Sequence, residues 1–96
     1  MSPSVPRPDK AELSVTRLAD ICLSFLAENP EELLGFMQYA GLDPATLRGS
    51  VGSPALERGL IDYVAANESL LLALCANSGL TPEEFMRVWH RINPAG

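Results

Sequence analysis

Histidine is scarce in this chain, and cysteine does not cluster. His90 is the one histidine among 96 residues, and neither of the two cysteines belongs to a CxxC pair. Histidine is the commonest general base in enzymes, and structural metal sites need cysteine or histidine ligands at short spacings. His90 stands near Arg87 and Arg91 at the end of an expected helix, where a solvated residue suits the helix dipole. These shortages argue against an enzyme, a metal site and a bound cofactor.

Long apolar runs are also missing. The longest run covers residues 70–76, whereas a membrane-spanning helix needs about 20 apolar residues. The sequence lacks the basic start and apolar stretch of a signal peptide, and a secreted domain of this size is usually dense in disulfides. Cys22 and Cys75 instead fall in separate apolar stretches, as unpaired buried cysteines do. We expect a cytoplasmic protein without a membrane segment.

Basic residues are outnumbered by acidic ones. Seven lysines and arginines against twelve aspartates and glutamates give a net charge of −5. Affinity for DNA comes largely from neutralised phosphates, so this balance disfavours nucleic acid as a partner. Most acidic residues stand where helices are expected to begin, and Arg48, Arg87 and Arg91 stand where helices end, as the helix dipole favours. The acidity therefore needs no ligand to explain it.

One helical domain is predicted over residues 9–93. A chain of 96 residues with an apolar fraction of 47% can bury one core but not two. The three prolines of residues 1–8 predict a disordered tail. Pro94 ends the last helical pattern and begins a short C-terminal tail at residues 94–96.

Short helices account for the pattern between the tails. Apolar residues at steps of three and four predict five to six helices in a compact all-α bundle. The first is expected to run from a capping box at Asp9 and Glu12 to about Asn29, which caps the helix that Pro30 begins. The Leu-rich helix at residues 70–75 is apolar on nearly all sides, so we expect it to be the most buried one.

Two similar turns separate helices in the sequence, GLDP at residues 41–44 and GLTP at residues 79–82. Glycine adopts the left-handed conformation that ends a helix, and the leucine after it folds back onto the last turn. The aspartate or threonine then caps the next helix, which the proline begins. Thr81 and Glu84 complete a capping box. Each turn is therefore predicted to be a helix stop joined to a helix start.

The glycine- and serine-rich residues 48–54 are predicted to be a linker. Ser53 caps the next helix, which Pro54 begins. Backbone N–H groups at residues 49–54 could face a phosphate, as those at helix starts do. The lysine and the full spacing of a P-loop are missing, so a hinge between two halves is the favoured interpretation.

A shift of 38 residues, which lays Asn29 over Asn67, aligns the two halves of the chain. Apolar residues and turn residues match together: Leu18 with Leu56, Phe25 with Tyr63, Phe36 with Leu74, Gly41 with Gly79, Pro44 with Pro82, and Leu47 with Phe85. The alternative is a chance alignment of Leu-rich helices. We predict two similar helix-helix-turn-helix units packed about a pseudo-twofold axis, because one unit cannot bury its apolar face alone.

Two stretches of the chain carry a resemblance to a known family. They read FLAENPEELLGFMQYAGLDPATLR at residues 25–48 and NESLLLALCANSGLTPEEF at residues 67–85. Both are similar to domain-of-unknown-function family 3572, a group of small helical proteins from alphaproteobacteria. The resemblance covers about residues 17–92 and is most specific in the two Gly-Leu-x-Pro turns and the acidic, Leu-rich run at residues 68–74. It implies an all-helical fold and a bacterial cytosolic setting, and it implies no activity.

The last helix carries more apolar residues than one core-facing stripe needs. We interpret Trp89 and Met86, together with Tyr39 and Tyr63, as a candidate interaction surface, because interfaces favour amphipathic aromatic residues and methionine. The alternative is that all four side chains fill the core. The first interpretation predicts a non-catalytic protein-interaction module, whose partner is an unidentified protein or a second copy.

A helix-turn-helix domain that binds nucleic acid is the alternative function, at residues 71–90. The residues with the spacing that holds the second helix of such a unit are Cys75, Leu80, Phe85 and Val88. That helix opens with Glu83 and Glu84, where phosphates would approach. We therefore favour protein interaction over nucleic acid binding.

Overall fold

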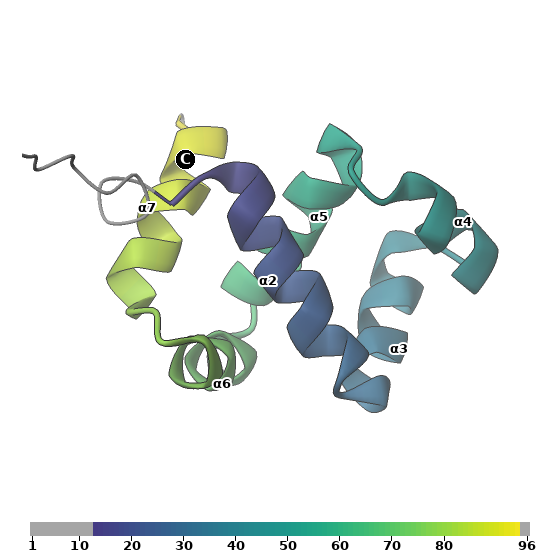
Figure 1. Cartoon of the computed structure of the whole chain (residues 1–96), viewed down its shortest axis with the longest axis horizontal. Coiled ribbons are helices and arrows are strands. Elements are labelled where there is room, and N and C mark those ends of the chain that lie inside the picture. Colours follow the sequence, from purple (N-terminus) through teal and green to yellow (C-terminus); the bar gives the residue numbers. More distant parts are fainter. Residues whose placement is uncertain (1–12, 95–96) are drawn as a thin grey trace, which may run out of the picture.

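The structure is a computed structural model that describes residues 13–94. This part of the chain forms six helices and no strand (Figure 1). In chain order they are α2 (Val15–Ala27), α3 (Pro30–Ala40), α4 (Pro44–Ser50), α5 (Pro54–Ala65), α6 (Glu68–Ser78) and α7 (Pro82–Ile92). The predicted all-α bundle of short helices is confirmed. The predicted tail at residues 1–8, the capping box at Asp9 and Glu12, and residues 95–96 lie outside the described residues.

Helix α5 lies at the centre of the bundle. It contacts α2, α3, α6 and α7, and its most extensive packing is against α2, which crosses in front of it in Figure 1. Helix α4 packs only weakly on the other helices and lies at one end of the molecule. The bundle is therefore built around the α2–α5 pair.

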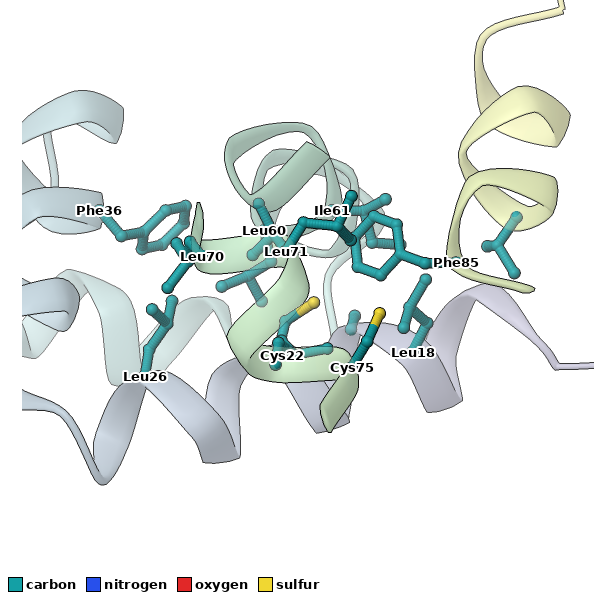
Figure 2. Packing of buried hydrophobic residues seen from close by; sticks show 14 of the residues in the cluster. Leu18, Cys22, Leu26, Phe36, Leu60, Ile61, Leu70, Leu71, Cys75 and Phe85 are labelled. Carbon is teal, nitrogen blue, oxygen red and sulfur yellow. The ribbon is translucent and has the colours of Figure 1, made fainter. Parts of the chain in front are cut away.

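The core between these helices is apolar. Figure 2 shows leucine, isoleucine, phenylalanine and cysteine side chains from α2, α3, α5, α6 and α7 converging there. Among the described residues, no polar or charged side chain is buried. Burying one large apolar side chain stabilises a fold by about 1.5–3 kcal/mol, so this cluster supplies the main driving force for folding.

The Leu-rich helix α6 is not the most buried helix, so that prediction is wrong. Helices α2, α5 and α6 each bury four residues. Leu72 on α6 remains 49% exposed, and Ala73 and Ala76 beside it are exposed as well. Only one face of α6 meets the core, so apolar residues around its whole circumference cannot all be covered.

The two predicted turns are confirmed, and they share one backbone geometry. Gly41 and Gly79 both have φ of 71°, in the left-handed region. The N–H of Leu42 donates to the carbonyl of Met37 over 2.9 Å, and the N–H of Leu80 donates in the same register to the carbonyl of Cys75 over 3.0 Å. Both turns therefore close their helix by the same six-residue hydrogen bond.

The helix starts after these turns are also capped as predicted. The Asp43 carboxylate accepts from the N–H of Thr46 over 2.7 Å, which lowers the pKa of Asp43. Thr81 and Glu84 form a complete capping box at the start of α7. The Ser53 hydroxyl caps α5 by accepting from the N–H of Leu56 over 3.2 Å.

Two helix boundaries differ from the sequence prediction, the start of α2 and the end of α4. Helix α2 begins at Val15 with Ser14 as its cap, so a continuous helix from Asp9 is wrong. The carbonyl of Leu13 accepts a hydrogen bond from Arg91 on α7, a tertiary contact that holds the chain outside the helix. Helix α4 continues through Gly49 to Ser50, so the predicted linker at residues 48–54 shrinks to residues 51–53.

The side chain of Asn29 does not cap α3 as predicted. Its amide nitrogen donates to the carbonyl of Phe25 over 2.7 Å, which closes the end of α2 instead. The corresponding Asn67 does cap its helix, because its Oδ1 accepts from the N–H of Leu70 over 3.2 Å. Pro30 begins α3 as predicted.

The two halves of the chain correspond closely in helix boundaries. A shift of 38 residues carries Pro30–Ala40 of α3 onto Glu68–Ser78 of α6, the end of α2 onto the end of α5, and the start of α4 onto the start of α7. The contacts of α2 with α3 and of α5 with α6 also correspond. The pseudo-twofold axis itself stays a prediction.

Candidate interaction surface

Three of the four predicted surface residues meet at one shallow depression of about 420 Å³. Tyr39 comes from α3, whereas Met86 and Trp89 come from α7. The residues that line the depression are Tyr39, Asp62, Ala65, Ala66, Met86, Trp89 and Asn93. We call these residues the aromatic face, and we include in it Tyr63, whose ring is tilted by 49° to that of Tyr39.

Aromatic rings on this face form a ladder from the core to solvent. Phe36 is fully buried and meets the ring of Tyr63 edge-on, with the ring centroids 5.5 Å apart. Tyr63 is half-buried, and its ring lies 5.2 Å from that of Tyr39. Tyr39 is 62% exposed, the largest exposure among the exposed large apolar side chains described. Its ring is therefore presented to solvent on a rigid support.

A glycine on α3 makes room for this ladder. A Cβ atom on Gly35 would lie 2.7 Å from the hydroxyl oxygen of Tyr63, closer than carbon and oxygen can pack. The absence of a side chain at Gly35 therefore allows Tyr63 to lie against α3. This close approach explains a glycine in the interior of a helix, where it costs about 1 kcal/mol relative to alanine.

Trp89 is anchored from below by a carboxylate on α5. Its indole N–H donates to Oδ1 of Asp62 over 2.9 Å. The side-chain amide of Asn93 donates to the same oxygen over 3.2 Å and to the carbonyl of Trp89 over 3.1 Å. Trp89 and Met86 are half-buried and pack against the core. Each of these two side chains thus fills the core with one side and lines the depression with the other.

Charged groups border the depression on one side. Oδ2 of Asp62 lies 3.8 Å from Nε of Arg58, and the guanidinium of Arg58 donates to Oδ1 of Asn93 over 3.2 Å. The Arg58 side chain is 56% exposed, so this ion pair contributes about 0–1 kcal/mol to stability. An apolar centre with a polar border is the arrangement found in protein interfaces.

Asp62 and Asn93 were outside the set of residues expected from the sequence. Their roles depend on how α5 and α7 pack, and that packing brings residues 27 and 31 positions apart into contact. The one local signal is the spacing of Arg58 and Asp62, which places opposite charges four residues apart on a helix. That spacing predicts an ion pair but not a hydrogen bond to a tryptophan.

The two cysteine thiols lie in the core, as Figure 2 shows. Burial, and to a smaller extent the charge of Cys75, raises the pKa of Cys22 to about 12. Burial, followed by the charge of Glu84, raises the pKa of Cys75 as well. Both thiols are therefore protonated at neutral pH, whereas the thiolate is the nucleophile and metal ligand. Residues 13–94 contain no group of three histidine, cysteine, aspartate or glutamate side chains placed to hold a metal ion.

Some of the residues of the alternative helix-turn-helix unit are placed as that unit requires. Cys75, Phe85 and Val88 are buried between α6 and α7 and their neighbours. The exposed positions of α7 carry both signs of charge, with Glu83 and Glu84 in its first turn. His90 is exposed, and an N–H at its Nδ1 donates to the carbonyl of Met86 over 2.8 Å. The start of α7 thus presents acidic groups where phosphates would need basic ones.

Across residues 13–94, no individual helix has the length and apolar character to cross a bilayer. Helices α5 and α6 reach that length and composition only when joined, and they meet at a bend of 107°. Most of their large apolar side chains, Leu60 and Leu74 among them, belong to the core described above.

The described residues form an all-helical fold, and each half of it contains one Gly-Leu-x-Pro turn that ends one helix and begins the next. Residues 12–95 match the family described as "Protein of unknown function (DUF3572)", and the chain therefore belongs to that family. This confirms the resemblance stated from the two Gly-Leu-x-Pro stretches. No curated protein and no solved structure matches the chain.

Proposed function

We propose that this protein is a non-catalytic interaction module that binds a partner protein through the aromatic face. The observation that carries the proposal is the 62% exposure of Tyr39, whose ring packs at a tilt against that of Tyr63 and lines the depression. Aromatic side chains with few rotatable bonds give contact area at a low cost in conformational entropy. A rigid, exposed aromatic beside a tryptophan is the composition of interface hot spots.

A partner protein fits this face better than a second copy does. The net charge of −5 gives each copy of the chain the same sign of charge, and like charges oppose association. The interaction takes place in the bacterial cytoplasm under this proposal. The unpaired, buried Cys22 and Cys75 support that location, because small secreted domains usually carry disulfides.

Site-specific photo-crosslinking tests the proposal. A benzophenone amino acid replaces Tyr39 in one variant and Val51, which is 59% exposed and does not line the aromatic face, in a matched control. Both variants are irradiated in cells of the organism from which the sequence comes. We expect a crosslinked product of higher mass from the Tyr39 variant and a much weaker one from the Val51 variant.

Three outcomes contradict the proposal. Equal crosslinking from both variants would mean that the contact is nonspecific, and no crosslinking from the Tyr39 variant would mean that the face stays open. A product of twice the chain mass, together with a concentration-dependent mass in sedimentation, would assign the face to a second copy.

Nucleic acid binding is the second candidate, and the burial of Cys75, Phe85 and Val88 is the observation that favours it. We expect no salt-sensitive shift of duplex DNA by the purified protein, because Glu83 and Glu84 occupy the exposed start of α7. A shift that disappears with rising salt and grows in a Glu83→Gln, Glu84→Gln variant would favour the helix-turn-helix function instead.

A further inference from the structure

We infer that the aromatic face recognises a cationic side chain, an arginine or lysine of a basic partner segment, between the rings of Tyr39 and Trp89 with Asp62 as the counter-charge. This inference rests on the proposed function and adds the chemistry of the partner. It follows from three features of the depression: its rings, its carboxylate and the charge of the chain around it.

The rings come from two helices that the fold brings together. Tyr39 on α3 and Trp89 on α7 both line the depression of about 420 Å³. The face of an aromatic ring attracts a cation placed within about 6 Å of its centre, and tryptophan gives the strongest attraction. Two rings on the wall of one depression therefore offer a cation two such surfaces.

The carboxylate is held in place and keeps an oxygen available. Oδ1 of Asp62 accepts hydrogen bonds from Trp89 and Asn93, which fix the orientation of the group. Oδ2 lies 3.8 Å from Nε of Arg58, a distance longer than a hydrogen bond. The Arg58 side chain is 56% exposed. Oδ2 can therefore accept from a guanidinium or ammonium group of a partner, with Arg58 displaced toward solvent.

The charge of the chain selects a basic partner. A net charge of −5 attracts cationic segments at long range and repels acidic ones. Attraction at long range is general, however, whereas two aromatic rings and a carboxylate held by side-chain hydrogen bonds line only the aromatic face among the depressions described. A depression of about 340 Å³ between α2 and α5 contains Asp20 and Glu57 but no aromatic residue. Asp20 also lines a depression of about 240 Å³ that contains one aromatic residue, Phe25, and the basic Arg17. A substitution of Asp20 therefore removes one unit of charge at a place without paired rings, which makes it the control for charge.

The test uses Trp89, the one tryptophan of the chain, as the reporter. A short capped peptide of alternating arginine and alanine is titrated against the full protein, and Trp89 fluorescence and heat of binding are followed. A second peptide carries citrulline in place of arginine, which keeps the shape and removes the charge. We expect saturable binding of the arginine peptide that moves Trp89 emission, and binding of the citrulline peptide that is weaker by about tenfold or more.

Variants then locate the site. Asp62→Asn keeps an oxygen acceptor for Trp89 and Asn93 but removes the charge, and Tyr39→Ala removes one ring. We expect each to weaken binding of the arginine peptide by about tenfold. Asp20→Asn removes the same unit of charge elsewhere, and we expect a change below about twofold, because exposed charges are screened. Circular dichroism of each variant establishes that it is folded.

Equal binding of the arginine and citrulline peptides would overturn the inference. So would equal losses from Asp62→Asn and Asp20→Asn, since binding would then depend only on total charge. If residue 39 still crosslinks to a partner in cells while the arginine peptide does not bind, the partner is not basic and only this inference fails. If the peptide binds as expected while no crosslink forms, the cation chemistry stands and the proposed function fails.

Discussion

Two depressions of this protein share lining positions that a shift of 38 residues aligns, and the residues at those positions differ in chemistry. Tyr39 and Asp62 line the aromatic face, whereas the residues 38 positions away, Asn77 and Ser24, line a second depression of about 240 Å³. We call it the polar depression, and its lining residues are Arg17, Asp20, Ile21, Ser24, Phe25, Glu28, Asn77 and Ser78. At these two aligned positions the aromatic face carries an aromatic ring and a carboxylate, whereas the polar depression carries an amide and a hydroxyl.

The third helices of the two halves differ just as clearly. Helix α4 has seven residues, buries only Leu47 and packs weakly, whereas α7 has eleven residues, buries Phe85 and Val88, and contacts α2, α5 and α6. After Leu47 the sequence continues with Arg-Gly-Ser, while after Phe85 it continues with Met-Arg-Val-Trp. The comparison teaches that similar turns set where a helix starts, and the residues after the turn decide whether it joins the core.

The largest expected effect comes from truncating the matched core residues of these two helices. Phe85→Ala should lower the free energy of unfolding by about 3–5 kcal/mol, because Phe85 is fully buried under α7. Leu47→Ala should cost about 2 kcal/mol, the low end for leucine, because α4 is peripheral. Urea unfolding measures both. Equal losses in the free energy of unfolding would mean that α4 contributes as much to the fold as α7. If the Phe85→Ala variant does not fold, the milder pair Phe85→Leu and Leu47→Val gives the same comparison.

A smaller effect is expected where the aromatic ladder meets α3. Gly35→Ala should lower stability by about 1 kcal/mol, because the overpacking of Tyr63 costs about 1–3 kcal/mol and the gain in helix propensity returns about 1 kcal/mol. Gly59→Ala on α5 is the control, since its Cβ would lie 4.0 Å from Phe36, and it should gain about 1 kcal/mol. Thermal unfolding of Gly35→Ala with and without Tyr63→Phe checks the cause, because removal of the hydroxyl should restore stability. A failure of Tyr63→Phe to restore it would contradict this explanation.

The next effect concerns the anchor of Trp89. Asp62→Ala should lower the free energy of unfolding by about 1 kcal/mol, because it leaves the indole N–H without its acceptor, whereas Asp62→Asn should cost less than half as much. Ser24→Ala, at the matching position of the polar depression, should be within about 0.5 kcal/mol of the parent chain. Denaturant unfolding measured side by side decides this, and a loss at Ser24 equal to that of Asp62→Ala would remove the distinction between the two sides.

The smallest effect is expected at the matched helix caps, Asp43 and Thr81. The hydrogen bond from the N–H of Thr46 lowers the pKa of Asp43 in the folded state, so the unfolded chain binds this proton more readily. The stabilisation is therefore present above the ordinary pKa of about 4 and is lost as pH falls through the lowered value. An Asp43→Thr variant, which copies the uncharged cap of α7, should lack this part of the acid sensitivity. Unfolding curves at neutral and acidic pH measure the difference, and identical acid sensitivity of the two proteins would refute the assignment.

Much of the fold follows from local rules in the sequence. Gly41 and Gly79 adopt the expected left-handed conformation, and Asp43, Ser53 and Thr81 cap the expected helices. These features depend on the backbone within one turn of each residue, which is why a sequence reveals them. The same holds for the helix boundaries that recur after 38 residues.

The errors arise where a second hydrogen-bond partner competes with the one that the local pattern predicts. Asn29 and Asn67 occupy equivalent positions, yet only Asn67 caps its helix, since Asn29 donates back to Phe25. The start of α2 likewise shifts to Val15, where Ser14 provides a cap and Leu13 is held by Arg91. Local rules cannot rank two partners that are both within reach of one side chain.

The candidate surface could be predicted only in part. The sequence indicates Tyr39, Tyr63, Met86 and Trp89 as amphipathic residues, and the structure brings them onto one face. It contains no signal for Asp62 as the acceptor of Trp89, because that contact joins helices whose relative placement no local pattern sets. The sequence alone therefore indicates which aromatic residues and methionine the surface contains. The hydrogen bonds between them and their neighbours depend on how the helices pack.

The two buried thiols can report how often the folded protein opens. Cys22 belongs to α2 and Cys75 to α6, so one reports on each half. An alkylating reagent can reach them only when the surrounding helices separate, and the labelling rate then follows the frequency of that separation. Equal alkylation rates at the two sulfurs would reveal a single cooperative opening. Unequal rates would show that one half opens independently of the other.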